Sequence, residues 1–236
     1  MAFFNKDRYS KPGPGIEKDA PPKKGLVLFF SIAGRELFGL FKLNLLFLLF
    51  CIPIVTIPAA LTAMSRITLH MVRDENYFMW QEFWETFKKE FFKSLAAGAL
   101  LATVLLLSWL SIQFYTLRLS QSMFFYILLA LSWLLLLLSM MAGFYLFPMI
   151  ALMDFPLKTS IQNSFLLVMA RLPANLAALA ANVFLIFLMV GFFPFTVPLV
   201  FVVFFAMLNL IAVFCAYSGM EKHVISSDHP VQEEKP

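Results

Sequence analysis

Charge is scarce in this 236-residue chain, since Asp, Glu, Lys and Arg together make up only 14% of it. A typical soluble domain is about 25% charged and roughly 45–50% apolar. Here hydrophobic residues form 61% of the sequence and the mean hydropathy is +0.83. A water-soluble fold of this size could not bury so much apolar surface. The composition therefore excludes a soluble enzyme, a nucleic-acid-binding protein and a disordered protein, and it predicts an integral membrane protein.

The residue patterns that carry intramembrane chemistry are missing as well. The chain has two cysteines, and no Cys-x-x-Cys pair indicates a redox motif or a zinc site. It also lacks the His-Glu-x-x-His helix of zinc proteases, the Gly-x-Ser-x-Gly nucleophile elbow and a Walker loop. We therefore expect no cofactor, no metal ion and no enzymatic activity.

Four stretches contain no charged residue, and they predict where the chain crosses the bilayer. They are residues 43–65, 94–117, 119–153 and 172–220. A helix needs about 20 apolar residues to span the bilayer core. The first two stretches therefore predict one span each, and the last must hold two.

The two longer stretches contain their own breaks. The third is interpreted as one span over residues 124–148, entered by an interfacial turn at Gln121 and Ser122. The fourth is divided near Gly191 and Pro194, residues that interrupt helices. The predicted fold class is all-α: a polytopic bundle of about five transmembrane helices with cytoplasmic interfacial amphipathic helices. It forms one domain over residues 26–220, between a disordered basic tail (1–25) and a polar C-terminal tail (221–236).

The first charge-free stretch leaves two topologies open, because prolines interrupt it near its middle. Either a kinked helix passes through the bilayer over residues 43–65, or the stretch folds back as a re-entrant hairpin. Irregular backbone at membrane depth is tolerated only where protein or a cavity covers it. Length alone favours five full passes.

Lysine and arginine near the span ends predict the orientation, because cytoplasmic loops carry an excess of them. Residues 66–93 hold five and residues 154–171 hold two, whereas the loop near Arg118 holds one. These two segments and the C-terminus are therefore expected on the cytoplasmic side of the membrane. Residues 1–42 hold eight more, which five full passes would place outside and a re-entrant hairpin would keep inside.

Two segments have the pattern of helices that lie on the membrane surface. Residues 26–42 predict one such helix leading into the first span. Residues 74–93 predict a helix with aromatic residues on one side and charged residues on the opposite side. Asp74 and Glu75 lie at its expected N-terminus. Its repeating aromatic positions include Trp80, Phe83, Trp84 and Phe87. This helix either anchors the second span or docks a soluble partner or a lipid headgroup.

The segment 153–173 predicts a short helix between two spans, with Asp154 as its cap and Arg171 near its end. It is either a connector or a coupling element for an ATPase subunit. The order of its residues resembles the coupling loop of ABC importer permeases, although the Gly of that loop is absent.

The predicted spans contain no ionisable residue, and Asn182 and Asn209 lie near the middle of the last two. Asparagine pairs can hold membrane helices together through hydrogen bonds. The alternative is a polar cleft for a sugar or a lipid group.

The chain contains Asn44-Leu-Leu and a run from Pro53 through Thr56 to Ile57, followed later by Ala170-Arg171-Leu172-Pro173. These residues resemble the signature of the bacterial YesL family, a domain of unknown function. Many members have Gly after Thr-Ile, where this chain has Pro58. In every interpretation Asn44, Pro53, Thr56 and Pro58 have a structural or path-lining role in the first membrane segment.

The resemblance implies a polytopic plasma-membrane protein of about five helices. Genes of the family commonly lie beside those for carbohydrate ABC importers, which implies a role in sugar uptake. The first hypothesis is a non-enzymatic accessory protein that docks importer subunits through the aromatic helix and the segment holding Asp154 and Arg171. The alternative is a small permease or channel for a neutral solute, acting as a homo-oligomer, with Asn182 and Asn209 along the path. A third is a structural or lipid-organising protein whose only partner is the bilayer.

Overall fold

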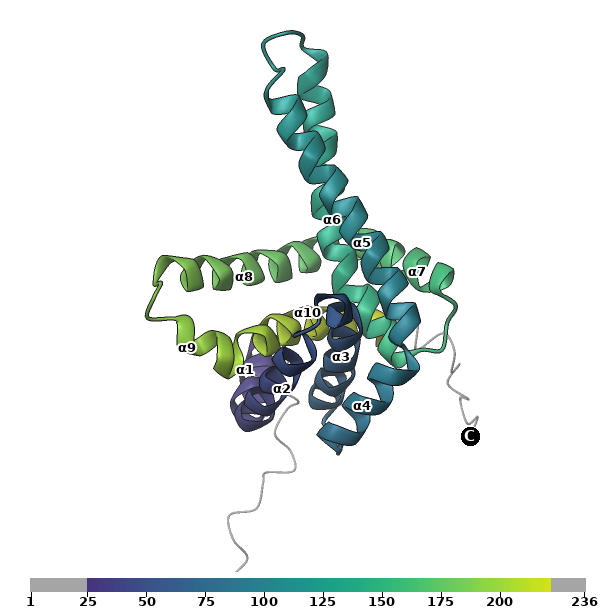
Figure 1. The fold of residues 1–236 in the computed structure, drawn as a ribbon, viewed down its shortest axis with the longest axis vertical. Helices are drawn as coiled ribbons and strands as arrows, with labels where there is room; N and C mark the ends of the chain where they lie inside the picture. The colour runs from purple at the N-terminus through teal and green to yellow at the C-terminus, as the bar shows by residue number, and fades with distance from the viewer. Residues whose placement is uncertain (1–24, 222–236) are drawn as a thin grey trace, which may run out of the picture.

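The computed structural model describes residues 25–221, and every regular element among them is helical. Apart from residues 25 and 221, the two predicted tails lie outside the described residues. The longer helices, labelled in Figure 1, are α1 (Leu26–Arg35), α2 (Leu37–Phe50), α3 (Ile57–Arg73), α4 (Met79–Lys89), α5 (Phe91–Thr116), α6 (Phe124–Leu152), α7 (Leu157–Ala170), α8 (Leu172–Gly191) and α10 (Phe205–Met220).

Five helical segments are long and apolar enough to cross a membrane. They are Ile54–Arg73, Phe91–Thr116, Phe124–Leu152, Leu172–Gly191 and Val197–Met220. The prediction of a multi-pass, all-α membrane protein is therefore confirmed. The breaks near Gln121 and after Gly191 also fall where the sequence placed them.

The first span does not run over residues 43–65, and the prediction of a through-going helix there is wrong. Helix α2 ends at Phe50, and a 3₁₀ turn (Ile54–Thr56) leads into α3. The outer ends of α2 and α3 meet again, since the Tyr77 hydroxyl donates to Glu36 Oε2 over 3.0 Å. The two helices therefore form an antiparallel hairpin, the alternative that the sequence left open. With 14 residues, α2 is also short for a span.

Pro53 and Thr56 build the turn of this hairpin. Proline cannot donate a backbone hydrogen bond and has a fixed φ, so a helix rarely continues through it. The Thr56 hydroxyl contacts the Phe50 carbonyl and donates to the Pro53 carbonyl over 2.6 Å. It thereby pairs carbonyl groups that the end of a helix leaves free.

Helix α3 lies at the centre of the fold and packs against α2, α4, α5, α6 and α10. Small buried side chains at Ala59, Ala60 and Ala63 allow neighbouring helices to approach closely. Next to them, Pro58 packs on Gly98 of α5, where a Cβ atom would lie 2.4 Å from Pro58 Cγ. The close approach of α3 and α5 therefore depends on glycine at position 98.

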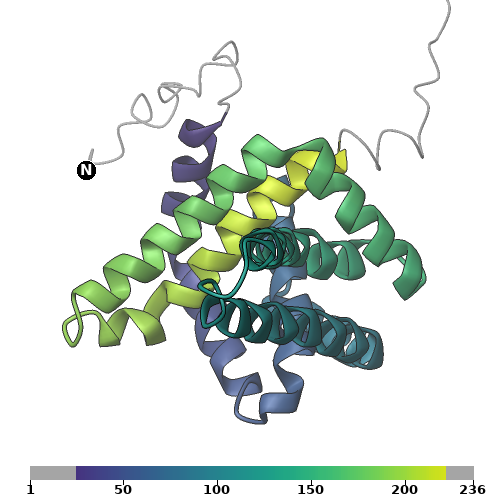
Figure 2. The same ribbon diagram turned by 90° about the horizontal axis from the view of Figure 1, so that it is seen from above.

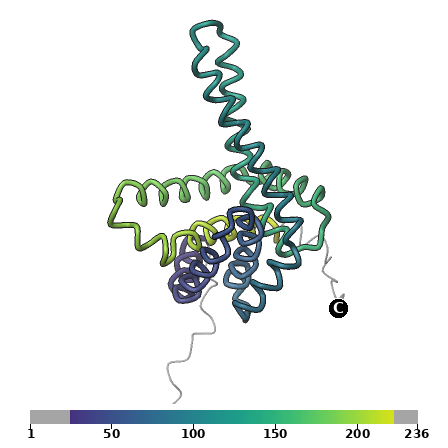
Figure 3. The backbone as a smooth tube through the Cα atoms, in the orientation of Figure 1, coloured from purple at the N-terminus to yellow at the C-terminus, as the bar shows by residue number. Residues whose placement is uncertain are grey.

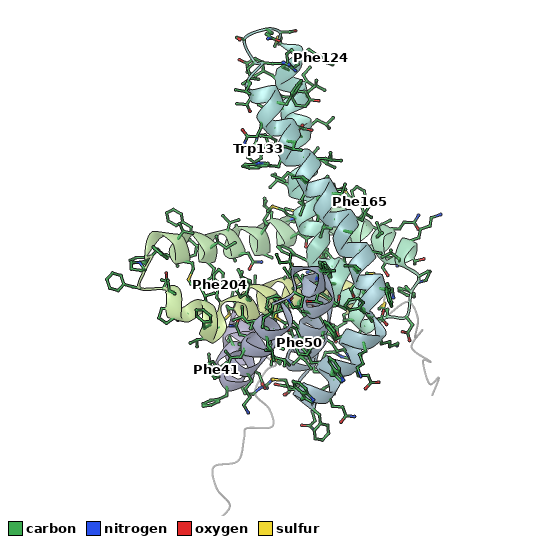
Figure 4. The ribbon with its side chains drawn as sticks, viewed as in Figure 1. Phe41, Phe50, Phe124, Trp133, Phe165 and Phe204 are labelled. Atoms are coloured by element: carbon green, nitrogen blue, oxygen red, sulfur yellow. The ribbon has the colours of Figure 1, made fainter. Side chains whose placement is uncertain are left out.

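Two hairpins project from the base formed by α1–α4 (Figures 1 and 3). Helices α5 and α6 form the longer one. In the other, α8 pairs with the segment that contains α9 (Val197–Leu199) and α10, and this hairpin runs in a different direction (Figure 2). Large apolar side chains cover the outer half of the first hairpin, including Phe124 and Trp133 (Figure 4), which are 60% and 46% exposed. Such surfaces are suited to contact with lipid.

Replacing Gly98 with Ala should destabilise the protein by roughly 1–3 kcal/mol, because the new methyl group would overlap the Pro58 ring. Gly34→Ala in α1 is the matched control, since nothing lies within 4 Å of its added Cβ. That change should leave stability unchanged or raise it by up to about 1 kcal/mol through helix propensity. Thermal unfolding in mild detergent measures both. Equal stability of Gly98→Ala and the wild type would contradict the proposed contact.

Candidate functional site

An apolar cavity of about 360 Å³ lies where the two hairpins meet. Its wall combines residues of α2, α3, α5, α6, α8 and α10, such as Met64, Leu105, Phe144, Ile186 and Leu208. Among the described residues that line it, Ser65, Asn182 and Asn209 are the ones whose side chains carry hydrogen-bonding groups. The volume falls within the roughly 300–1,000 Å³ of typical small-molecule sites. We call this site the inter-hairpin cavity.

The two asparagines of the inter-hairpin cavity differ in their bonding. Asn209 accepts a hydrogen bond from Ser65 Oγ over 3.1 Å and donates one to Thr68 Oγ1 over 2.9 Å. It therefore holds α10 against α3, as the structural interpretation predicts. Asn182 is only 7% exposed, and its buried Oδ1 has no hydrogen-bond partner among the described residues. An unpaired buried polar group costs about 1–3 kcal/mol, so Asn182 is the unusual residue of the two.

Asn44 is a structural residue outside the inter-hairpin cavity. Its Nδ2 donates to the carbonyls of Val200 and Phe201, both at 2.8 Å, and its Oδ1 accepts from the Ala206 N–H at 3.2 Å. These backbone groups belong to the π-helical turn Val200–Phe204 and the start of α10. The fully buried Asn44 thus joins α2 to the irregular beginning of the last helix.

Pro53, Thr56 and Pro58 also have structural positions, in the α2–α3 turn and the first turn of α3. None of them belongs to the wall of the inter-hairpin cavity. A path-lining role for these residues has no support in the geometry of this site.

Helix α4 carries the predicted aromatic face, but the face is divided between core and surface. Phe83 is fully buried, whereas Trp80 is 61% and Trp84 37% exposed. Trp84 lies between Trp80 and Phe87, with ring centroids 6.5 Å and 5.9 Å apart. Phe50 from the end of α2 packs against this row, 4.9 Å from Phe87. We call Trp80, Trp84 and Phe87 the aromatic row.

Asp74 and Glu75 do not start this helix, contrary to prediction, because α4 begins only at Met79. Asp74 ends α3 instead, in a left-handed conformation with φ of 57°. Glu75 turns back to α3, where it lies 2.8 Å from His70 Nδ1 and 2.9 Å from Arg73.

A polar cavity of about 460 Å³ lies between α3, α4 and the end of α6. His70 in its wall lies between two carboxylates, with Nε2 2.5 Å from Glu82 and Nδ1 facing Glu75. Arg66 donates to the Ala151 carbonyl over 3.2 Å. Arg66 and His70 belong to α3, so the expectation that the spans contain no ionisable residue is wrong. The cause is the displaced first span, which ends at Arg73 rather than Ser65.

Asp154 does not cap the following helix, because α7 begins at Leu157 with Pro156 before it and no side-chain cap. Asp154 instead accepts a hydrogen bond from Lys89 Nζ over 2.7 Å and so ties the α6–α7 connection to α4. This contact lowers the pKa of Asp154 below 3.8 and raises that of Lys89 above 10.5. The pair is therefore lost only when the pH falls through the lowered carboxyl pKa or rises through the raised lysine pKa.

Arg171 connects the start of α8 to the last helix. Its guanidinium donates to Ser218 Oγ over 2.9 Å and to the Cys215 carbonyl over 3.4 Å. Nearby, the buried Asn175 accepts from the Tyr145 hydroxyl over 2.6 Å and donates to the Val168 carbonyl over 3.2 Å. The role of Asn175 is not predicted from the sequence, although it lies in the same charge-free stretch as Asn182. Arg171 and Asn175 thus join helices, and the guanidinium of Arg171 is already bonded to the last helix.

Within residues 25–221 no group of three or more His, Cys, Asp or Glu side chains is placed to hold a metal ion. In the polar cavity His70 pairs with Glu82, Lys89 pairs with Asp154, and Arg66 bonds to the Ala151 carbonyl. These contacts join α4 to α3 and to the α6–α7 connection.

Asn44→Leu should lower the free energy of unfolding by about 1–3 kcal/mol, because two carbonyls and one N–H lose their partner in an apolar environment. Asn182→Leu removes no hydrogen bond and should leave stability unchanged or raise it. Reversible unfolding in SDS and mild detergent compares the two variants. An equal loss of stability in both would show that the bonding of the two amides is not as described.

The comparisons with known proteins concern the N-terminal part of the fold. Residues 26–112 match the family described as "Protein of unknown function, DUF624". This range includes the α2–α3 hairpin, the aromatic row and most of α5. Comparisons with curated proteins and with solved structures give no significant match. YesL-type proteins carry the DUF624 domain, and the resemblance of this chain to the YesL family is therefore confirmed over residues 26–112.

Proposed function

We propose that the protein is a non-enzymatic accessory protein of a carbohydrate ABC importer in the bacterial plasma membrane. The observation that carries this proposal is the exposed Trp80 at the end of the aromatic row. Tryptophan is enriched among the few residues that dominate binding energy at protein interfaces. The YesL resemblance supports the class of partner, because it implies a role beside carbohydrate importers.

The helix that carries the aromatic row is packed against the core, which favours its use as a docking surface. Phe83 anchors α4 in the core, while the contact of His70 with Glu82 and the ion pair of Lys89 with Asp154 fix its two ends. A surface that is already ordered loses little conformational entropy on binding. Trp80 is therefore presented at a low entropic cost to a partner.

The orientation belongs to the same proposal, with α4, the α6–α7 connection and the C-terminus on the cytoplasmic side. The excess of Lys and Arg in these segments supports it. The α2–α3 hairpin supports it as well, because its two outer ends meet at Glu36 and Tyr77 on one side. Residues before the hairpin would then share the cytoplasmic side with the C-terminus, so the basic N-terminal segment would not have to cross the membrane.

A second candidate function is a permease for a neutral solute, and the unpaired Asn182 amide is the observation that favours it. The Asn209 amide is already bonded to Ser65 and Thr68. A solute would therefore meet fewer free polar groups along the path than the sequence suggests. Proteoliposomes loaded with the purified protein would test it by uptake of radiolabelled glucose and glycerol. Uptake that Asn182→Leu does not alter would count against this candidate.

Trp80→Glu should reduce the recovery of importer subunits at least roughly tenfold, because a charge would replace the exposed aromatic anchor. The measurement is purification of the tagged protein from native membranes in mild detergent, followed by quantitative mass spectrometry of importer permease and ATPase subunits. Gln81→Glu is the matched control, since it adds the same charge at the next position of α4, where the side chain is exposed. It should retain the partner.

The proposal fails if the wild type is recovered without importer subunits, or if Trp80→Glu recovers as much of them as Gln81→Glu. Thermal unfolding of both variants must match the wild type. Recovery of the wild type only with lipid would favour a membrane-anchoring role for the aromatic row.

A further inference from the structure

The inter-hairpin cavity combines two features that a surface facing lipid does not need. It contains a side-chain amide, that of Asn182, which is more than nine-tenths buried and has no hydrogen bond to any described residue. Its wall includes no Asp, Glu, Lys, Arg or His. The site is thus uncharged and almost wholly apolar, yet it holds one unsatisfied polar group. This combination indicates a mostly apolar ligand that carries one uncharged polar group.

We propose that the inter-hairpin cavity binds one uncharged lipid that carries a free hydroxyl group, with this hydroxyl bonded to the Asn182 amide. The apolar part of the lipid lies against side chains such as Leu101, Leu105, Phe144 and Ile186. This binding site is independent of the aromatic row, which lies on α4, and it does not rest on the importer proposal.

The chemistry of the wall selects the headgroup. A phosphate or an ammonium group would be desolvated here without an opposite charge, which is costly. A hydroxyl both donates and accepts, so it can bond to the Asn182 amide whichever way its oxygen and nitrogen point. A headgroup without a hydrogen-bond donor, such as an ester, can accept from Asn182 Nδ2 but leaves the buried Oδ1 unpaired. An uncharged lipid with a hydroxyl is therefore the class that fits.

The position of the cavity indicates how such a lipid enters. The cavity is partly open, and it lies between two hairpins whose outer surfaces are apolar and exposed. Val183 belongs to its wall and is itself 53% exposed. A ligand can therefore reach Asn182 from the hydrocarbon phase without passing through water.

Neither water nor a second copy of the chain satisfies the amide as well. A buried water needs about two to four polar partners, and the other polar groups of the wall, Ser65 and Asn209, are already bonded to each other. The hydroxyls along the α5–α6 hairpin donate to carbonyls of their own helices, at Thr103, Ser108, Ser132 and Ser139. The same hairpin of a second copy would therefore bring no free donor from these positions.

The test compares two lipids in which the same glycerol hydroxyl is either free or acetylated. The full-length protein is placed in phosphatidylcholine nanodiscs containing either 1,2-dioleoylglycerol or 1,2-dioleoyl-3-acetylglycerol, whose hydroxyl is capped. Native mass spectrometry then measures the fraction of protein that retains each lipid. The wild type should retain dioleoylglycerol roughly threefold to tenfold better, the value of one hydrogen bond.

Three variants locate the effect. Asn182→Leu should retain both lipids equally, and Ser132→Ala, a matched loss of one polar group on the other hairpin, should keep the wild-type preference. Val183→Trp should lower the retention of both lipids by filling the cavity mouth from an exposed position.

Equal retention of the two lipids by the wild type would overturn the proposal. So would an unchanged preference in Asn182→Leu, a phosphatidylcholine adduct that dioleoylglycerol does not displace, or a lipid-free dimer. Failure of the importer co-purification would leave these outcomes unaffected, so the two proposals can fail separately.

Discussion

The rest of the fold depends on the pairing of polar side chains along α3 with the helices around it. Thr62 lies 2.7 Å from Ser94 of α5, and Ser65 and Thr68 bond to Asn209 of α10. Arg66 reaches the end of α6, and His70 faces Glu82 of α4. Such a helix would be costly to expose to hydrocarbon, because its polar groups would lose their partners. Its place at the centre of the bundle satisfies them, and the apolar helices are left to face the lipid.

This arrangement separates a bonded base from two apolar hairpins. Asn44, Asn175 and Arg171 join neighbouring helices, and each does so through at least two hydrogen bonds. Asn182 lies outside this network, in the wall of the inter-hairpin cavity, and its Oδ1 remains unpaired. The contrast between Asn209 and Asn182 therefore marks the boundary between structural polar groups and one available for a ligand. The aromatic row lies on α4, which does not line the inter-hairpin cavity, and is therefore a separate surface.

The sequence predicts the membrane class, the helical fold and the last four long helices, because uncharged stretches and helix breakers mark them directly. It misplaces the first span, since α3 contains Arg66 and His70 and is recognisable only once their partners on α4 and α6 are known. The same limit applies to the polar residues. Asn44, Asn182 and Asn209 look alike in the sequence, whereas their roles depend on which backbone or side-chain groups lie opposite. Asp154 and Glu75 are predicted to lie at the starts of helices. In the structure Asp154 instead binds Lys89, which is distant in the chain, and Glu75 binds His70 and Arg73 of the preceding helix.

The most direct test of this account is the side of the membrane on which each end of the α2–α3 hairpin lies. Single cysteines at Gly34, Asn76 and Gln121, all exposed, would be introduced into a chain in which Cys51 and Cys215 are replaced by serine. A membrane-impermeant maleimide then labels spheroplasts and inverted vesicles. The account predicts that positions 34 and 76 react from the same side and position 121 from the other. Labelling of position 34 from the side of position 121 would show that α2 and α3 cross the membrane as one span, and would contradict the central hairpin.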